Sequence, residues 1–352
     1  MKSELPMKTA TVSTDERLAG ATRLRRLMTR PELGAAVGAV AVFGFFAAYT
    51  EQFATPLGIA NVLDPAATLG IMAVAVALLM IGGEFDLSAG VMTASSGLIV
   101  AMLSTQAGLN VWAAVLVAIG FGAAVGLCNG LLVVRTGLPS FIVTLGSFLV
   151  LQGFNLGVTK LVTGTVQVSG VSAAPGHDSA RAVFASTVPI AGAQFRVTVI
   201  WWLALTVLAT WVLLRTRSGN WIFAAGGNPA AARSVGVPAA RTKVWLFVTV
   251  STTASLVGAM LLLRLSSVQA NGGIGEELQY IAAAVIGGCL LTGGFGSAIG
   301  AAIGALIFGM AKQGIVFAGW DSDWFLLFLG TLLLLATLLN HYVRRRAEAK
   351  PS

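Results

Sequence analysis

Residues 215–243 read RTRSGNWIFAAGGNPAAARSVGVPAARTK, and they separate two long apolar segments of the chain. The stretch has no acidic residue and five basic ones, namely Arg215, Arg217, Arg233, Arg241 and Lys243. Loops of membrane proteins that are rich in Lys and Arg remain in the cytosol. We therefore expect this stretch to lie on the cytosolic side of a membrane.

The middle of this stretch predicts a short helix. Asn228 can cap it, and Pro229 suits its first turn. The alanines that follow favour helix, and Gly236 ends it before Pro238. Such a helix is too short to be stable alone in water, and it is too short and too polar to span a bilayer. We expect it to be ordered by docking onto a partner protein in the cytosol.

The composition indicates an all-α integral membrane protein. Of 352 residues, 56% are hydrophobic and 10% are charged, whereas soluble domains carry about a quarter charged residues. A large soluble core would need charged helix faces at a 3.6-residue period, and a porin-type barrel would need alternating strands. The uninterrupted apolar segments of this chain fit neither a soluble core nor a barrel.

The net charge of +8 comes from the two tails and one loop. Membrane topology and anionic headgroups therefore explain it better than a nucleic acid partner.

A window of roughly 20 apolar residues per span predicts about ten membrane helices. Arg135, residues 215–243 and the basic C-terminus then fall inside, while most acidic loop residues fall outside, so both termini are expected in the cytosol. We divide the chain into a basic tail (1–30), a membrane domain (31–343) and a second basic tail (344–352). The expected spans lie near residues 33–50, 65–83, 89–105, 111–134, 138–157, 196–214, 244–263, 278–293, 296–312 and 324–341.

The long outward loop at residues 158–195 is rich in small residues and has few charges. It can contain short strands or a small helix. Two interpretations stand side by side: it contacts an extracytoplasmic partner, or it simply connects two spans.

The stretch GGEFDLSAG, residues 82–90, interrupts the apolar pattern. Gly82 and Gly83 end one apolar segment, Glu84 and Asp86 follow, and Ser88 can cap the next helix. Acidic residues beside a span are costly unless they cap a helix, form a pair or face water. The stretch is either a helix break at a substrate path or a capping turn in which Asp86 accepts from free N–H groups. For Asp86 the capping turn is favoured.

Residues 264–288, RLSSVQANGGIGEELQYIAAAVIGG, repeat this order of glycines, acidic residues and a helix of small residues. Gly272 and Gly273 precede Glu276 and Glu277, which suit a helix start. One of the two loops is expected inside and the other outside, as an inverted repeat would produce. A third glycine group, Gly293 and Gly294, predicts a tight turn between two spans.

Polar residues inside the expected spans are candidates for contact with a solute. Hydrogen bonding between helices is favoured for any one of them, and lining of a water-filled path is the alternative. As a set, the candidates for contacting a polar uncharged solute are Asn129, Phe141, Gln152, Phe154 and Asn155.

Several motifs are absent from the sequence. There is no GxxxxGK[ST] phosphate-binding loop, so the chain is not expected to hydrolyse ATP. HExxH, GxSxG and CxxC patterns are missing too. His177 and His341 are too far apart for a joint metal site, and both cysteines lie in apolar segments. We predict a protein that is not an enzyme and has no cofactor or metal.

Three stretches together resemble the signature regions of the ribose-type permeases of bacterial ABC sugar importers. They are GGEFDLSAGVMTASSG, AAGGNPAAARSVGVPAARTKVWLFV and RLSSVQANGGIGEELQYIAAAVIGGCLLTGGFG, and their order and spacing match over roughly residues 33–341. The sequence departs from the family at Glu84, where many members have an uncharged GIDLS-like version. The resemblance implies that a coupling helix, formed around Gly227, Asn228, Pro229, Ala231, Arg233 and Gly236, docks into an ATPase.

The resemblance also implies partners and a location. It implies a homodimer or heterodimer of permease subunits in the inner membrane, two ATP-binding subunits and a periplasmic sugar-binding protein. We therefore expect the permease subunit of an ATP-driven importer of a monosaccharide or related polyol. The alternative is an ion-coupled secondary transporter that uses Glu84 or Asp86 as its proton or sodium site.

Overall fold

The computed structural model describes residues 31–348 and is built almost entirely of helices. The tail expected at residues 1–30 lies outside this range, as do residues 349–352. Within it, seven helices are long and apolar enough to cross a membrane. They are α2 (Pro31–Tyr49), α3 (Pro56–Ile81), α5 (Val111–Thr136), α6 (Ser140–Thr163), α8 (Thr198–Arg215), α11 (Ala239–Leu265) and α13 (Ala298–Phe317).

Three further helices fall on the remaining expected spans. Helix α4 (Ala89–Thr105) and the first part of α14 (Trp324–Glu348) are shorter apolar segments. Helix α12 (Glu276–Ile286) has only 11 residues. At about 1.5 Å per residue it is about 17 Å long, roughly half of the ~30 Å hydrocarbon core. The expected all-α membrane architecture is confirmed, and α12 is a half-length element where a full span at 278–293 was expected.

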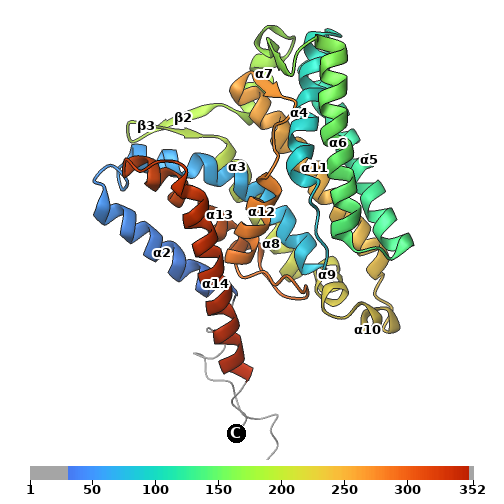
Figure 1. The fold of residues 1–352 in the computed structure, drawn as a ribbon, viewed down its shortest axis with the longest axis vertical. Coiled ribbons are helices and arrows are strands. Elements are labelled where there is room, and N and C mark those ends of the chain that lie inside the picture. Colours follow the sequence, from blue (N-terminus) through green and yellow to red (C-terminus); the bar gives the residue numbers. More distant parts are fainter. Residues whose placement is uncertain (1–30, 349–352) are drawn as a thin grey trace, which may run out of the picture.

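Figure 1 shows two groups of helices with α12 between them. One group holds α4, α5, α6 and α11, and the other holds α2, α3, α8, α13 and α14. Helices α9 (Arg217–Gly227) and α10 (Pro229–Ser234) lie at one end of the molecule. Helix α7 (His177–Phe184) lies at the opposite end. Residues 215–243, which we call the coupling stretch because of its expected docking into an ATPase, and the loop at residues 158–195 thus occupy opposite ends, as the sequence predicted.

The two groups pack in corresponding pairs. Helix α11 packs most extensively against α5, and α3 against α13, while α4 lies on α5 as α12 lies on α13. Small residues permit the close approach. A Cβ on Gly126 of α5 would lie 2.6 Å from the Phe247 carbonyl oxygen of α11, and one on Gly304 of α13 would overlap the Ala283 carbonyl of α12. The segments α3–α6 and α11–α14 therefore share one packing pattern.

Short strands close the end opposite α10. Strand β1 (Gln167–Ser169) pairs antiparallel with β4 (Ser267–Gln269), and β2 (Thr187–Ile190) forms a hairpin with β3 (Ala193–Arg196). A 3-10 turn, η2 (Val171–Ala173), follows β1. The strands and the small helix expected as options in the 158–195 loop are both present. The β1–β4 pair also brings this loop beside the segment that follows α11.

Helix α3 begins nine residues before the expected span at 65–83. The Thr55 side chain accepts a hydrogen bond from the Gly58 N–H, and Pro56 occupies the first helical position, which suits its missing N–H group. Pro65 lies inside the helix without ending it. Helices α3 and α11 are mostly buried, and they form the centre of the molecule.

Candidate functional site

The coupling stretch folds into two helices. Helix α10 begins where it was predicted: the Asn228 carboxamide oxygen accepts from the N–H groups of Ala230 and Ala231 at 3.1 and 3.0 Å. Pro229 occupies its first turn, and Gly236 adopts a positive φ of 84° just beyond its end. Sequence reasoning missed α9. Thr216 could have indicated the start of this helix, because its hydroxyl accepts a hydrogen bond from the Gly219 N–H and caps the helix.

Helix α10 is held by one face only. Ala232 is buried against the rest of the molecule, whereas Asn228, Ala231, Arg233 and Gly236 are exposed. Val235 is also 78% exposed at the tip of this segment. An exposed helix with an apolar tip and an exposed cation, Arg233, at the end of a membrane bundle has the surface that a partner protein can contact.

Five glycines from three separate segments of the chain meet just before α10. We call Gly83, Gly226, Gly227, Gly293 and Gly294 the glycine junction. They come from the end of α3, the end of α9 and the loop before α13.

Backbone packs directly on backbone at this junction. The Gly294 N–H donates to the Ile81 carbonyl at 2.8 Å. A Cβ on Gly226 would overlap that same carbonyl, and a Cβ on Gly293 would lie 2.7 Å from the Cα of Gly83. Gly83, Gly293 and Gly294 also have positive φ angles, which side chains disfavour. At the junction, the backbone of the coupling stretch therefore contacts the backbone at the end of α3 directly, with no side chain between them.

Glu84 is paired. Its carboxylate accepts a hydrogen bond from the ammonium of Lys243, in the first turns of α11, and both side chains are largely buried at 10% and 18% exposure. An acidic side chain beside a span is expected to be paired. Glu84 thus joins the α3–α4 break to the end of the coupling stretch, a contact that sequence reasoning did not find.

Asp86 organises a buried polar network. Its Oδ1 accepts from the backbone N–H of Ser88 at 2.9 Å and from the Ser88 hydroxyl at 2.5 Å. Asn129 of α5 donates to the Ser88 hydroxyl at 3.1 Å and accepts from Ser147 of α6 at 2.5 Å. Ser88 is the residue before α4, but its side chain makes no capping hydrogen bond. The network holds α4, α5 and α6 together, so Asn129 has a bonding role here.

Two segments interrupt the helices of the bundle: residues 82–88 between α3 and α4, and residues 266–275 between α11 and α12. We call them the two helix breaks, and they contact each other inside the bundle. A Cβ on Gly90, in the first turn of α4, would overlap the Gly273 carbonyl and the Glu277 carboxylate. Glu277 itself accepts from the Gly275 N–H at 3.1 Å. The two loops were expected on opposite sides of the membrane, and their contact requires at least one of them to enter it. Helices α4 and α12 both begin here, so their positive N-terminal ends converge.

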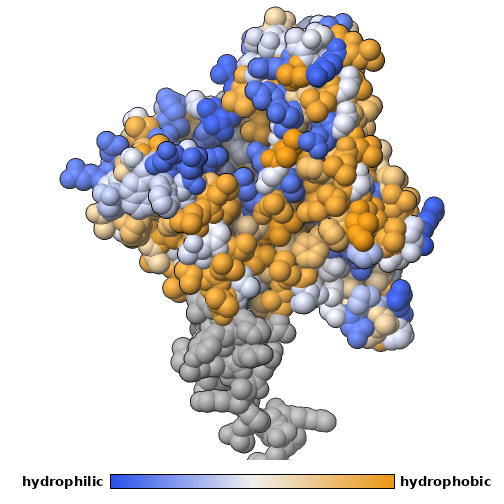
Figure 2. All heavy atoms as spheres, in the orientation of Figure 1, coloured by the Kyte–Doolittle hydropathy of each residue, from blue (hydrophilic) through white to orange (hydrophobic). Residues whose placement is uncertain are grey.

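A polar cavity of about 360 Å³ lies next to this meeting point, between α3, α11, α12 and α13. Asp64 of α3 accepts from Arg264 of α11 at 2.7 Å and lies 3.5 Å from Arg196 of β3. Across the cavity, the Tyr280 hydroxyl donates to Glu276 at 2.6 Å. Lys312, Gln279 and Gln313 complete the polar lining beside Phe308. In the orientation of Figure 2, hydrophilic residues gather in the upper part of the molecule, above a belt of apolar residues.

The cavity lining is electrically balanced. It contains the carboxylates of Asp64 and Glu276 and the cationic groups of Arg264 and Lys312. Asp64 is paired with Arg264, and its Oδ1 atom has no hydrogen-bond partner among residues 32–338, whose side chains the structure describes. The lining offers donors, acceptors and an aromatic ring without a net charge, which suits a neutral polar solute.

The other residues expected on a solute path lie elsewhere. Phe141 and Phe154 are half-exposed on α6, Gln152 is partly buried and Asn155 is buried. None of them lines the polar cavity. Where the two breaks meet, Gly90 contacts Gly273 and Glu277, whereas Glu84 and Asp86 bind Lys243 and Ser88 instead. Phe141 and Phe154 lie on a separate surface of α6.

A helical membrane bundle with two broken segments that meet inside it, an exposed helix at one end and a polar cavity towards the other has the architecture of a transport protein. Residues 58–337 match the family of branched-chain amino acid transport system permease components, and the chain belongs to this family.

Characterised relatives narrow the class further. The chain is 31% identical to the fructose import permease protein FrcC of Rhizobium meliloti, over 86% of this chain and 81% of the relative. It is 32% identical to the ribose import permease protein RbsC of Escherichia coli K12, over 83% and 88%. It is 30% identical to the inner membrane ABC transporter permease protein YjfF of the same organism, over 86% and 89%. No solved structure matches the chain. The chain is an inner-membrane permease subunit of an ABC importer and not itself an enzyme.

Proposed function

We propose that this chain moves a neutral monosaccharide or related polyol, driven by separate ATPase subunits. The exposed, Asn228-capped α10 carries the proposal, because the glycine junction and the Glu84–Lys243 pair join it to the α3–α4 break. The relatives named for fructose and ribose, and the electrically balanced cavity, support a neutral sugar.

The coupling step follows from these contacts. Gly227, Asn228, Pro229, Ala231, Arg233 and Gly236 form the surface that the ATPase contacts. Closure of the ATPase pair moves α9 and α10 as one unit. Since backbone packs on backbone at the junction, the displacement passes to Gly82, Gly83 and Glu84 instead of being absorbed by flexible side chains.

The gate lies where the two breaks meet. Displacement of residues 82–88 changes the contact of Gly90 with Gly273 and Glu277. The acidic and small residues of both breaks then open or close the path from the polar cavity to the cytosolic side of the membrane, where α10 lies. The gate residues are Gly82, Gly83, Glu84, Asp86, Ser88, Gly272, Gly273, Glu276, Glu277, Gly293 and Gly294.

The topology that we propose has ten membrane segments, with α12 as a half-length one and both termini in the cytosol. The corresponding packing of α3–α6 and α11–α14 supports an inverted repeat, since five segments per repeat reverse the second half relative to the first. The half-exposed Phe141 and Phe154 of α6, with the partly buried Gln152, then face a second permease subunit, identical or not, whereas Asn155 is buried inside this one. Two ABC ATPases and a periplasmic sugar-binding protein complete the importer.

Co-purification tests this proposal against an ion-coupled carrier. The tagged chain is expressed with its neighbouring genes, purified in detergent and assayed for ATPase activity. We expect an ATPase to co-purify, with an activity that rises when a sugar-loaded binding protein is added. A chain that purifies alone and moves solute in liposomes under an ion gradient would contradict it and favour Asp86, whose Oδ2 atom has no partner among the described residues.

A further inference from the structure

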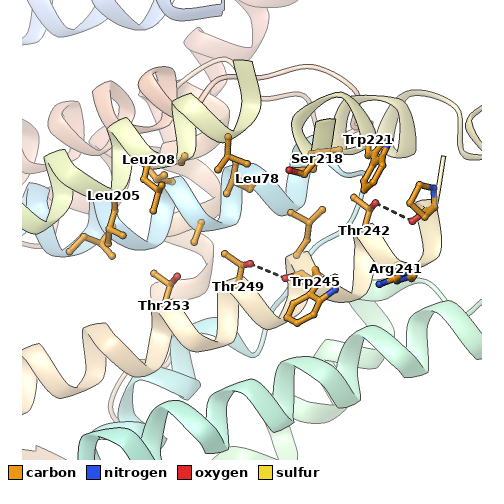
Figure 3. A pocket seen from close by; sticks show the side chains of 18 residues that line it. Leu78, Leu205, Leu208, Ser218, Trp221, Arg241, Thr242, Trp245, Thr249 and Thr253 are labelled. Atoms are coloured by element: carbon orange, nitrogen blue, oxygen red, sulfur yellow. Dashed lines mark hydrogen bonds between the residues drawn. The ribbon is translucent and has the colours of Figure 1, made fainter. Parts of the chain in front are cut away.

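A groove of about 460 Å³ lies between α3, α8, α9 and α11, away from the polar cavity. Figure 3 shows that its two ends differ in chemistry. Leu205 and Leu208 line one end, opposite Thr253 of α11. Ser218, Trp221 and Arg241 lie at the other end, and all three belong to the coupling stretch. The groove is lined mainly by apolar side chains, with the threonine hydroxyls of Thr249 and Thr253 along α11, and its charged group, Arg241, lies at one end.

The length of the groove matches the depth of one leaflet. Arg241 and Thr253 both line it, and they are twelve residues apart on α11. At about 1.5 Å per residue they are separated by about 18 Å, slightly more than half of the ~30 Å hydrocarbon core. A lipid acyl chain that extends inward from the membrane surface covers this distance.

The polar end suits an anionic headgroup. Arg241 has no ion pair with any side chain of residues 32–338, the side chains that the structure describes, whereas the nearby Lys243 is paired with Glu84. The stretch 215–243 has no acidic residue that could compete for it. Trp221 and Trp245 are 37% and 63% exposed at this end. Tryptophan side chains favour the membrane–water interface, and basic residues there attract anionic lipids.

We infer that this groove holds an acyl chain of an anionic phospholipid from the cytosolic leaflet, with the lipid phosphate at Arg241. The mostly apolar wall offers few partners for the hydroxyl groups of a sugar, so it suits an acyl chain better than the transported solute. The lipid contacts α8, α9 and α11 together and so braces the coupling stretch against the bundle. The inference rests on the proposed cytosolic side of residues 215–243 and not on the identity of the solute.

Native mass spectrometry of the purified chain tests the inference. The protein is taken from nanodiscs that contain equal amounts of phosphatidylglycerol and phosphatidylcholine with identical acyl chains, and the retained lipid is counted. We expect retention of phosphatidylglycerol about five-fold over phosphatidylcholine, the size set by one basic residue at the surface. Equal retention of both lipids, or retention of neither because a second copy of the chain covers the groove, would overturn the inference.

Four variants locate the site. Arg241→Gln should abolish the preference for phosphatidylglycerol, and Arg241→Lys should keep it. Arg135→Gln is the matched control, because Arg135 is exposed at the end of α5 that is expected in the cytosol and does not line the groove. Thr253→Phe narrows the apolar end and should lower retention of both lipids without a change of charge. An unchanged preference in Arg241→Gln, or an equal loss in Arg135→Gln, would place the lipid elsewhere.

Discussion

Helices α3 and α11 are connected by an ion pair near each end, and the two pairs differ. At the coupling end Glu84, just beyond α3, binds Lys243 of α11 next to the glycine junction, where backbones touch. At the other end Asp64 binds Arg264 and Arg196 beside an open polar cavity. The coupling end is tightly packed and can transmit a displacement, whereas the cavity end has room and spare donors for a solute. The predictions below test this contrast.

The largest effect is expected at the buried pair of the coupling end. Lys243→Met leaves the Glu84 carboxylate without its cation in a largely buried position, which costs about 3–5 kcal/mol. We expect a strong loss of folded protein, measured by yield and by the thermal unfolding temperature in detergent. The double variant Lys243→Met with Glu84→Gln removes the unpaired charge and should recover most of the stability. A double variant as unstable as the single one would show that the pair itself is not the cause.

Adjacent glycines at the junction give the next test. A Cβ on Gly226 overlaps the Ile81 carbonyl, whereas a Cβ on Gly227 meets only the Gly294 Cα at 3.9 Å. Gly226→Ala should therefore cost about 1–3 kcal/mol through overpacking and lower uptake at least about ten-fold by displacing α9 from α3. Gly227→Ala adds the same methyl group at the neighbouring position, where it has room, and should lower uptake much less than Gly226→Ala does. Similar uptake by both variants would contradict a tightly packed junction.

Much of this architecture could be predicted from the sequence, because it depends on local composition. Apolar blocks located the membrane helices, and Asn228 with Pro229 located α10. The contacts that join the elements could not be predicted. The Glu84–Lys243 pair links positions 159 residues apart, and it depends on how α3 and α11 pack. The same holds for Gly90 against Gly273, since the charge bias of loops assigns a side of the membrane but not a depth.

A smaller effect is expected at the cavity end. Asp64→Asn removes the charged acceptor of Arg264 and Arg196, but these side chains are 19–28% exposed, and solvent screening weakens such pairs. We expect a loss of about 1.5 kcal/mol in stability and a clear change in solute uptake, measured as the KM of the reconstituted importer. Gln313→Glu, which adds a negative charge to the same cavity, should raise the KM for a neutral sugar with less effect on stability. Unchanged KM values in both variants would remove the cavity from the solute path.

The smallest effect on stability, with a selective effect on function, is expected at the cap of α10. Asn228→Ala removes the oxygen that accepts from the N–H groups of Ala230 and Ala231, and loss of such a cap costs about 1 kcal/mol. Because α10 is exposed and only Ala232 is buried, this cost falls on the local helix and leaves the membrane bundle intact. Insertion and thermal unfolding should therefore match the unmodified protein, while sugar-dependent stimulation of the ATPase declines. Asn228→Asp keeps an acceptor at the cap and should restore the stimulation. If Asn228→Ala lowers bundle stability and ATPase stimulation equally, α10 is a structural part of the bundle and not its connection to the ATPase.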